Sequence, residues 1–186
     1  MFAFLRKPLW HPFRRWSKDT RGVSAVEFAL ILPVMLTIYL GGNELGHALT
    51  IARKVTHVTS SLGDLVTQSK SITNTDMTNI LNAAASVMTP YAINVLKIKV
   101  SGVAIDANSK ATVSWSDAYN DTALAKNTVI TNLPAAVKVA NTFIVMAEVH
   151  YAYTPLIGYV MTGTFDLKDQ FYLRPRLSDT IARTAS

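Results

Sequence analysis

The chain has 186 residues, a length that suits one globular unit and leaves no room for a two-domain catalytic architecture. Hydrophobic residues make up 49% of the composition and charged residues 16%, which indicates a membrane segment and excludes a largely disordered chain. The sequence contains no cysteine, so disulfides, thiolate metal sites and cysteine nucleophiles are excluded.

The formal net charge of +6 comes mainly from the first residues of the chain. Residues 1–22 hold six Lys or Arg side chains and one Asp, and the rest of the sequence is nearly neutral. Nucleic-acid recognition needs basic residues clustered on a folded body, which this distribution does not provide. We therefore expect no nucleic-acid partner, and we interpret residues 1–22 as a cytoplasmic basic leader.

An apolar segment, VSAVEFALILPVMLTIYLGG, follows at residues 23–42, with Glu27 as its sole charged residue. As a helix it would span about 30 Å, the thickness of the hydrocarbon core of a bilayer. The basic residues before it predict that the body after it is exported to the periplasm. Neighbouring helices can satisfy the carbonyl that Pro33 frees, so we expect a kink there and not an end of the helix. The segment is longer than the apolar core of a cleavable secretory signal, which disfavours that alternative.

A carboxylate within a membrane helix is costly, so Glu27 is a functional hypothesis in itself. The alternative is that Glu27 lies near the helix N-terminus, where the helix dipole and headgroup water reduce the cost. If the chain were cut after Gly22, Val23 would carry a new α-ammonium group one helical turn before Glu27. The buried acid would then have a partner of opposite charge, in its own chain or in a packed neighbour.

This pattern, Gly22 and Glu27 between a basic leader and an apolar helix, resembles the class III signal of type IV pilins and pseudopilins. A prepilin peptidase cuts such signals on the cytoplasmic side. With Phe28, Leu30 and Pro33 in register, the string is more particularly similar to TadE-like pseudopilins of the tight adherence (Tad, or Flp) pilus system. The resemblance extends over about residues 20–91.

The resemblance implies a non-enzymatic minor pseudopilin for assembly, initiation or tip formation of a Tad/Flp type IV pilus. It would lie in the bacterial inner membrane with a periplasmic C-terminal domain, and would be incorporated in the pilus or at its tip. The implied partners are the prepilin peptidase, other Tad pseudopilins and pilin subunits, the inner-membrane assembly platform and the lipid bilayer. Cleavage would separate Gly22 from Val23, Glu27 would align the helix by pairing with an α-amine, and Phe28 and Pro33 belong to the same assembly segment.

A function of another class stays open on the residues alone. The chain would then be an uncleaved, single-pass, membrane-anchored periplasmic binding or sensor module in which Glu27 is incidental. Retention of residues 1–22 in the mature protein would distinguish it.

Beyond residue 42 the pattern becomes amphipathic. Apolar or small residues recur at alternating spacings of three and four, a heptad-like seam that predicts continuation of the helix to about Ser69; they are Leu45, Ala48, Ala52, Val55, Thr59, Leu62 and Val66. The seam is expected to dock the stalk on its own domain, to pack against other subunits, or to do both along its length. Gly41 and Gly42 could instead break the helix. We assign residues 23–71 to the membrane helix and stalk and residues 72–186 to the head.

The head shows one helical pattern and then patterns of period two. Residues 77–88 predict a helix that Thr75 caps and Pro90 stops. Alternation predicts strands near residues 96–100, 113–115, 143–153 and 165–173, with a polar loop at 117–132. The expected fold class is α+β, a pilin-like head with a roughly four-stranded antiparallel sheet.

Catalytic chemistry is not expected, because no nucleophile, phosphate-loop or dinucleotide motif occurs. Glu44 and His47 lie three apart on a helix, a spacing that suits two ligands of one metal, but no third ligand is evident. Glu148 and His150 share the strand face opposite the apolar one, which favours a solvated face over a ligand pair. We therefore predict no catalytic residues, no cofactor and no metal. The motif Arg174-Pro175-Arg176 favours ordinary solvated charges over ion pairs with a partner subunit.

Overall fold

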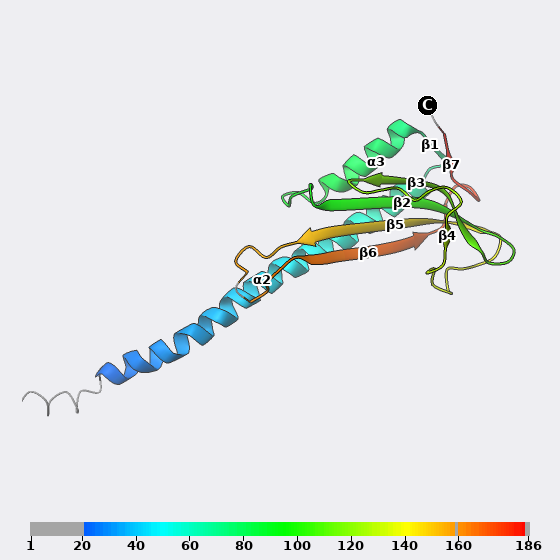
Figure 1. Cartoon of the computed structure of the whole chain (residues 1–186). Coiled ribbons are helices and arrows are strands. Elements are labelled where there is room, and N and C mark those ends of the chain that lie inside the picture. Colours follow the sequence, from blue (N-terminus) through cyan, green and yellow to red (C-terminus); the bar gives the residue numbers. More distant parts are fainter. Residues whose placement is uncertain (1–20, 159, 185–186) are drawn as a thin grey trace, which may run out of the picture.

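The computed structural model describes residues 21–158 and 160–184, so residues 1–20 of the predicted leader 1–22 lie outside the described part, and α2 begins at Arg21 inside that leader. One long helix carries an α+β head on its C-terminal half (Figure 1). The elements are α2 (Arg21–Thr67), β1 (Ser71–Ile72), α3 (Asn74–Ser86), β2 (Leu96–Ile105), β3 (Ala111–Tyr119), β4 (Val129–Ile130), β5 (Thr142–Tyr153), β6 (Phe165–Leu173) and β7 (Ala182–Arg183).

The predicted long helix is confirmed as α2, a single helix of 47 residues. It continues through Pro33, as expected, and also through Gly41 and Gly42, where a break was the alternative. The hydroxyl of Thr37 donates to the carbonyl of Pro33 at 2.8 Å, one turn back along the helix. The helix ends at Thr67, two residues before the predicted end.

The C-terminal half of α2 docks on its own head, which is one of the two uses expected of the seam. Its buried apolar side chains are Ala48, Ile51, Val55, Val58, Leu62 and Val66. The predicted seam is wrong at Leu45, which is 52% exposed, because Glu44 takes the inward position there. Both residues satisfy a spacing of three or four, and only contact with the head decides between them.

Helix α3 begins one turn earlier than its apolar pattern indicates. Thr73, and not the predicted Thr75, is the N-cap, and it forms a reciprocal capping box with Asp76. The Asp76 amide donates to the Thr73 hydroxyl at 3.1 Å, and the Asp76 carboxylate accepts the Thr73 amide at 3.1 Å. An acid stands three residues after Thr73, whereas Thr78 stands three residues after Thr75, so only Thr73 can complete the box.

Replacing Thr73 by alanine is expected to lower the free energy of unfolding by about 1 kcal/mol, the usual cost of a lost N-cap. Thr75→Ala is the matched control, and it should change stability by less than about 0.5 kcal/mol because Thr75 is an exposed surface position. Denaturant unfolding of the detergent-solubilised full chain measures both. Equal losses for the two variants would contradict the assignment of the cap.

The capping box also predicts a pH dependence. The hydrogen bond from the Thr73 side chain, followed by that from the Thr73 backbone, lowers the pKa of Asp76 below its ordinary value of 3.8. A lowered pKa contributes stability above the ordinary value, and this contribution is lost as the pH falls through the lowered pKa. The difference between wild type and Thr73→Ala should therefore shrink in strongly acidic buffer.

The head is built on a five-stranded antiparallel sheet of order β4-β3-β2-β5-β6. Four of these are the expected strands, and the short edge strand β4 is an addition. The predicted loop at residues 117–132 is therefore wrong at both ends, because β3 extends to Tyr119 and β4 pairs with the start of β3. A second, parallel pair joins β1 to β7 near the end of the chain.

The two faces of the sheet are covered differently. Helices α2 and α3 pack on one face and share the main hydrophobic core with β2 and β5 (Figure 1). Tyr151 and Tyr153 point into this core, as their alternation predicts, and are 5% and 7% exposed. A smaller core on the other face joins Ile105, Ile144 and Met146 to Leu133. The connection between β3 and β5 thus covers part of that face.

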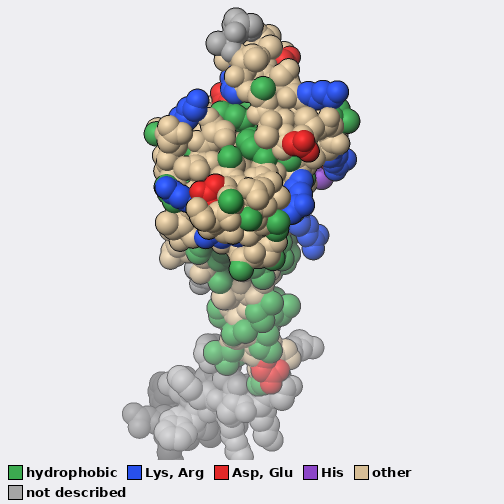
Figure 2. All heavy atoms as spheres, turned by 90° about the vertical axis from the view of Figure 1, so that its right-hand side faces the viewer, with side chains coloured by type: hydrophobic (Ala, Val, Ile, Leu, Met, Phe, Trp, Pro, Cys, Tyr) green, Lys and Arg blue, Asp and Glu red, His purple; other side chains and the backbone are tan. Residues whose placement is uncertain are grey.

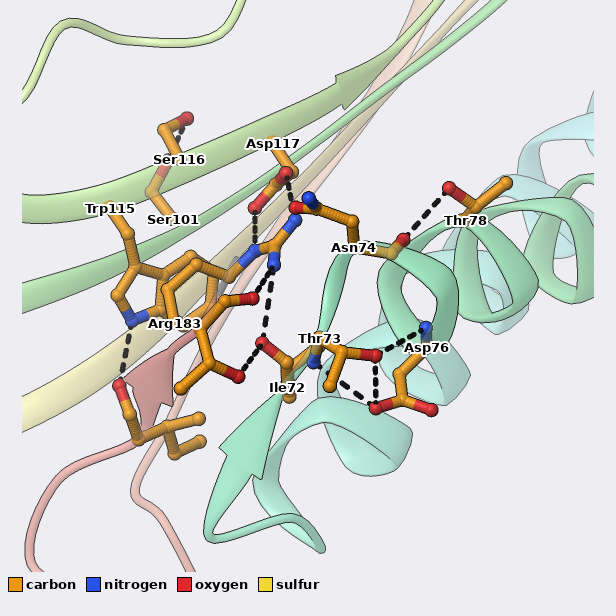
Figure 3. Close-up of polar contacts among 12 residues, drawn as sticks. Ile72, Thr73, Asn74, Asp76, Thr78, Ser101, Trp115, Ser116, Asp117 and Arg183 are labelled. Carbon is orange, nitrogen blue, oxygen red and sulfur yellow. Dashed lines mark hydrogen bonds and ion pairs between the residues drawn. The ribbon is translucent and has the colours of Figure 1, made fainter. Parts of the chain in front are cut away.

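The C-terminal segment ties the sheet to the start of α3 (Figure 3). The Arg183 guanidinium donates to both carboxylate oxygens of Asp117 at 2.9 Å and to the Ile72 carbonyl at 3.2 Å. The hydrogen bond to Asp117 is the main cause that raises the pKa of Arg183. The Trp115 indole donates to the Ile181 carbonyl at 2.8 Å. The last described residues therefore close the fold against both β3 and β1.

Candidate functional site

Among the described residues, exposed large apolar side chains are concentrated on α2 before it reaches the head. Every residue from 22 to 39 is exposed, and Figure 2 shows hydrophobic side chains gathered on the helix below the head. Its large apolar side chains are 38% to 70% exposed; they are Val23, Val26, Phe28, Leu30, Ile31, Leu32, Val34, Met35, Leu36, Ile38 and Tyr39. This helix is long and apolar enough to cross a bilayer, which indicates a membrane anchor.

All five predicted site residues lie on this exposed part of α2. Gly22 and Val23 stand in its first turn, where a Cβ on Gly22 would meet no atom within 4 Å. Glu27 lies one turn after Val23, about 6 Å further along the helix axis. Within the part of the chain that the structure describes, the Glu27 side chain forms no ion pair or hydrogen bond. Phe28 and Pro33 are exposed as well.

Polar contacts with the head fix the C-terminal half of α2, beyond the exposed segment. Asp64 near the helix end forms an ion pair with Arg176, and the Arg176 amide donates to the Thr67 carbonyl at 3.0 Å. Thr56 in the middle donates to the Asp169 carboxylate at 2.5 Å. Arg176 therefore pairs within its own chain. The head and the C-terminal half of α2 form one packed unit, and the N-terminal half of α2 projects from it.

Lys54 attaches the same part of α2 to the end of α3. Its ammonium donates to the carbonyls of Val87 at 3.2 Å and Thr89 at 2.5 Å. It also lies 5.4 Å from the centre of the Tyr91 ring, in cation–π range. Since these carbonyls follow the last turn of α3, Lys54 satisfies backbone acceptors that the helix leaves open.

Glu44 has a structural use that the sequence pattern did not reveal. The residue is 3% exposed, and its carboxylate accepts the backbone amides of Val160 at 3.3 Å and Met161 at 3.0 Å. His47, its expected neighbour in a metal pair, is exposed. Glu44 therefore clamps the connection between β5 and β6 to the helix. The signal that could have found it is an acid at an inward position of an apolar seam.

The second acid and histidine pair is likewise divided between other partners. The Glu148 carboxylate accepts the Gln170 amide at 2.6 Å, and the His150 ring lies 3.0 Å from the Asp166 carboxylate. These contacts link β5 to β6 on the sheet face away from the helices. Within the described residues, no group of three His, Cys, Asp or Glu side chains is placed to hold a metal ion.

Residues 22–61 match the family model described as TadE-like protein. This segment is TadE-like. The resemblance read from Gly22, Glu27, Phe28 and Pro33 is thereby confirmed, and the match contains all of these residues. It ends within α2 and does not extend over residues 62–91, which the resemblance includes. No curated protein and no solved structure matches the chain.

The TadE-like match and the geometry fall on the same part of the molecule. The matched segment begins one residue after the start of α2 and ends where α2 lies against the head. It thus combines the exposed apolar helix with its attachment to the head. The family indicates a protein associated with Tad pilus assembly, and the helix indicates attachment to a membrane.

Proposed function

We propose that this chain is a minor pseudopilin that acts in assembly, initiation or tip formation of a Tad/Flp pilus. The observation that carries the proposal is the exposed apolar half of α2, which starts at Gly22, bears a single acid at Glu27 and matches the TadE-like family. A prepilin peptidase cuts after Gly22, and Val23 becomes the new N-terminus. The leader lies in the cytoplasm and the head in the periplasm, as the charge distribution favours.

In this role the helix is the assembly element and the head is the recognition domain, with no chemistry of its own. The exposed side chains of residues 23–39 pack against lipid before assembly and against helices of other pseudopilins and pilins afterwards. Glu27 pairs with the α-amine of a neighbouring subunit or of its own chain, which fixes the helix at one depth. Because α2 packs on the pilin-like head, the depth of the helix also sets the position of the head relative to the membrane.

The cleavage step is tested by the mass of the mature N-terminus in membrane fractions of cells with and without their prepilin peptidase. We expect a chain that starts at Val23 in cells with the peptidase and at Met1 in cells without it. The variant Gly22→Leu should accumulate as full-length precursor. Gly42→Leu is the matched control at the other end of the span, since a Cβ at either glycine meets nothing within 4 Å.

A chain that starts at Met1 in both strains would contradict the cleavage step. It would favour the uncleaved, membrane-anchored periplasmic module instead. Normal maturation of Gly22→Leu would remove Gly22 as the recognition residue while leaving the membrane anchor in place.

A further inference from the structure

The connection between β5 and β6, residues 154–164, contains no charged residue and carries the most exposed large apolar side chain of the described chain. Leu156 is 98% exposed, Ile157 51% and Val160 48%. Isolated exposed leucines are common on proteins, but here three apolar residues gather in one loop. The position of this loop relative to α2 indicates what covers it.

The loop is fixed to one position along the axis of α2. Glu44 accepts the amides of Val160 and Met161, as described above. One turn below, the missing side chain of Gly41 makes room for Val160, whose Cγ2 lies 3.1 Å from the point where a Cβ would stand. The loop therefore cannot slide along the helix without breaking these contacts, and Figure 1 shows it beside α2 at the end of the head from which the helix projects.

The position of this attachment along α2, at Gly41 to Glu44, coincides with the end of the apolar span. Gly41 stands 19 residues after Gly22, about 28 Å along the helix, which matches a hydrocarbon core of about 30 Å. At Gly41 the exposed apolar surface of α2 thus meets Val160. Leu156 and Ile157 line a shallow pocket with Asn43 and His47, just beyond the end of the span. A loop without charges at this level meets the boundary between acyl chains and headgroups.

We propose that this loop, described at residues 154–158 and 160–164, dips into the periplasmic leaflet of the same bilayer that α2 spans, so that the head sits on the membrane at a fixed tilt. The occupant of this apolar patch is lipid. The proposal rests on the membrane anchor of the proposed function and adds a second, peripheral contact to it. A subunit that leaves the bilayer for a pilus must then withdraw this loop as well as the helix.

The test uses single-cysteine variants of the full chain, which has no cysteine of its own. A small fluorophore is attached at Ile31 in the span, at Leu156 in the loop or at Leu177 on the head. Leu177 is the matched control, a leucine 57% exposed whose neighbour Arg176 bonds to Thr67. Thr67 lies 26 residues beyond Gly41, about 39 Å further from the membrane along α2.

The labelled proteins are reconstituted into phosphatidylethanolamine and phosphatidylglycerol vesicles whose acyl chains carry bromine either near the headgroup or near the bilayer centre. At Leu156 we expect blue-shifted emission and a loss of fluorescence that is larger with shallow bromine than with deep bromine. Ile31 should lose more fluorescence with deep bromine. Leu177 should show no loss with either lipid.

Three results would overturn the inference. If Ile31 is quenched while Leu156 behaves like Leu177, the anchor stands and the loop contact is wrong. If Leu156 responds to the density of protein in the vesicles and not to bromine, the patch binds another protein. If Ile31 is not quenched, the membrane anchor fails and the loop contact fails with it.

Discussion

Replacing Glu27 by alanine is expected to leave cleavage after Gly22 intact and to remove nearly all assembled pili. The proposed pairing places the Glu27 carboxylate and an α-ammonium group together in a low-dielectric helix bundle. Loss of one member of a buried ion pair costs about 3–5 kcal/mol. Since about 1.4 kcal/mol corresponds to a factor of ten, docking of the subunit should weaken at least a hundredfold. Pili sheared from cells, quantified against mature protein in the membrane, measure the effect.

Glu27→Gln is the informative companion, because it keeps the size of the side chain and removes only its charge. An ion pair predicts that the glutamine variant assembles about as poorly as the alanine variant. Glu148→Ala serves as the control for loss of an acid on the head, where the Glu148 carboxylate accepts a hydrogen bond from Gln170. Normal piliation by both Glu27 variants would rule out the pairing role, whatever the outcome of the cleavage test.

The architecture of the long helix could be predicted because its determinants are local in sequence. A run of apolar residues gives the exposed half of α2, and a spacing of three and four gives the docked half. The predicted seam and the observed one share Ala48, Val55, Thr59, Leu62 and Val66. They differ at Leu45 and Glu44, because the polarity of a carboxylate favours an outward position. The amides of Val160 and Met161, more than a hundred residues away along the chain, contribute to making its burial favourable.

The long strands could also be predicted, because alternating apolar and polar residues are a local signal. The shortest strands could not. Strands β1, β4 and β7 contain two residues each, too few to show a period of two. Their positions depend on tertiary partners such as Asp117, which accepts the Arg183 guanidinium across the fold. The ion pair of Arg176 with Asp64 depends in the same way on a tertiary partner, although Arg176 stays exposed to solvent, as its sequence context favours.

The residues of the candidate site could be proposed from the sequence because their proposed role does not depend on the head. Gly22, Glu27 and Pro33 lie on a single helix, and their spacing along the chain fixes their spacing in space. What the sequence did not contain is the second apolar surface near the membrane. The loop with Leu156 becomes a neighbour of the span only through the fold of β5 and β6 and the clamp at Glu44.

The head should respond most strongly to a methyl group at Gly102. This residue pairs directly with Trp115 across β2 and β3, where the ladder contains an irregularity. A Cβ at position 102 would stand 2.4 Å from two atoms of the Trp115 indole and 2.6 Å from the Phe143 ring. These rings are 8% and 6% exposed, so neither can swing into solvent. The indole is also held by its hydrogen bond to the Ile181 carbonyl.

Gly102→Ala is therefore expected to lower the free energy of unfolding by about 3 kcal/mol, the upper part of the usual range for overpacked cores. That corresponds to a fall in Tm of about 10 °C for a domain of this size, measurable by thermal unfolding in detergent. In the double variant Gly102→Ala with Trp115→Leu, the smaller side chain makes room for the methyl group. The double variant should be more stable than the sum of the two single losses predicts. Additive losses would show that the strain lies in the backbone of β2 and not in contact with the indole.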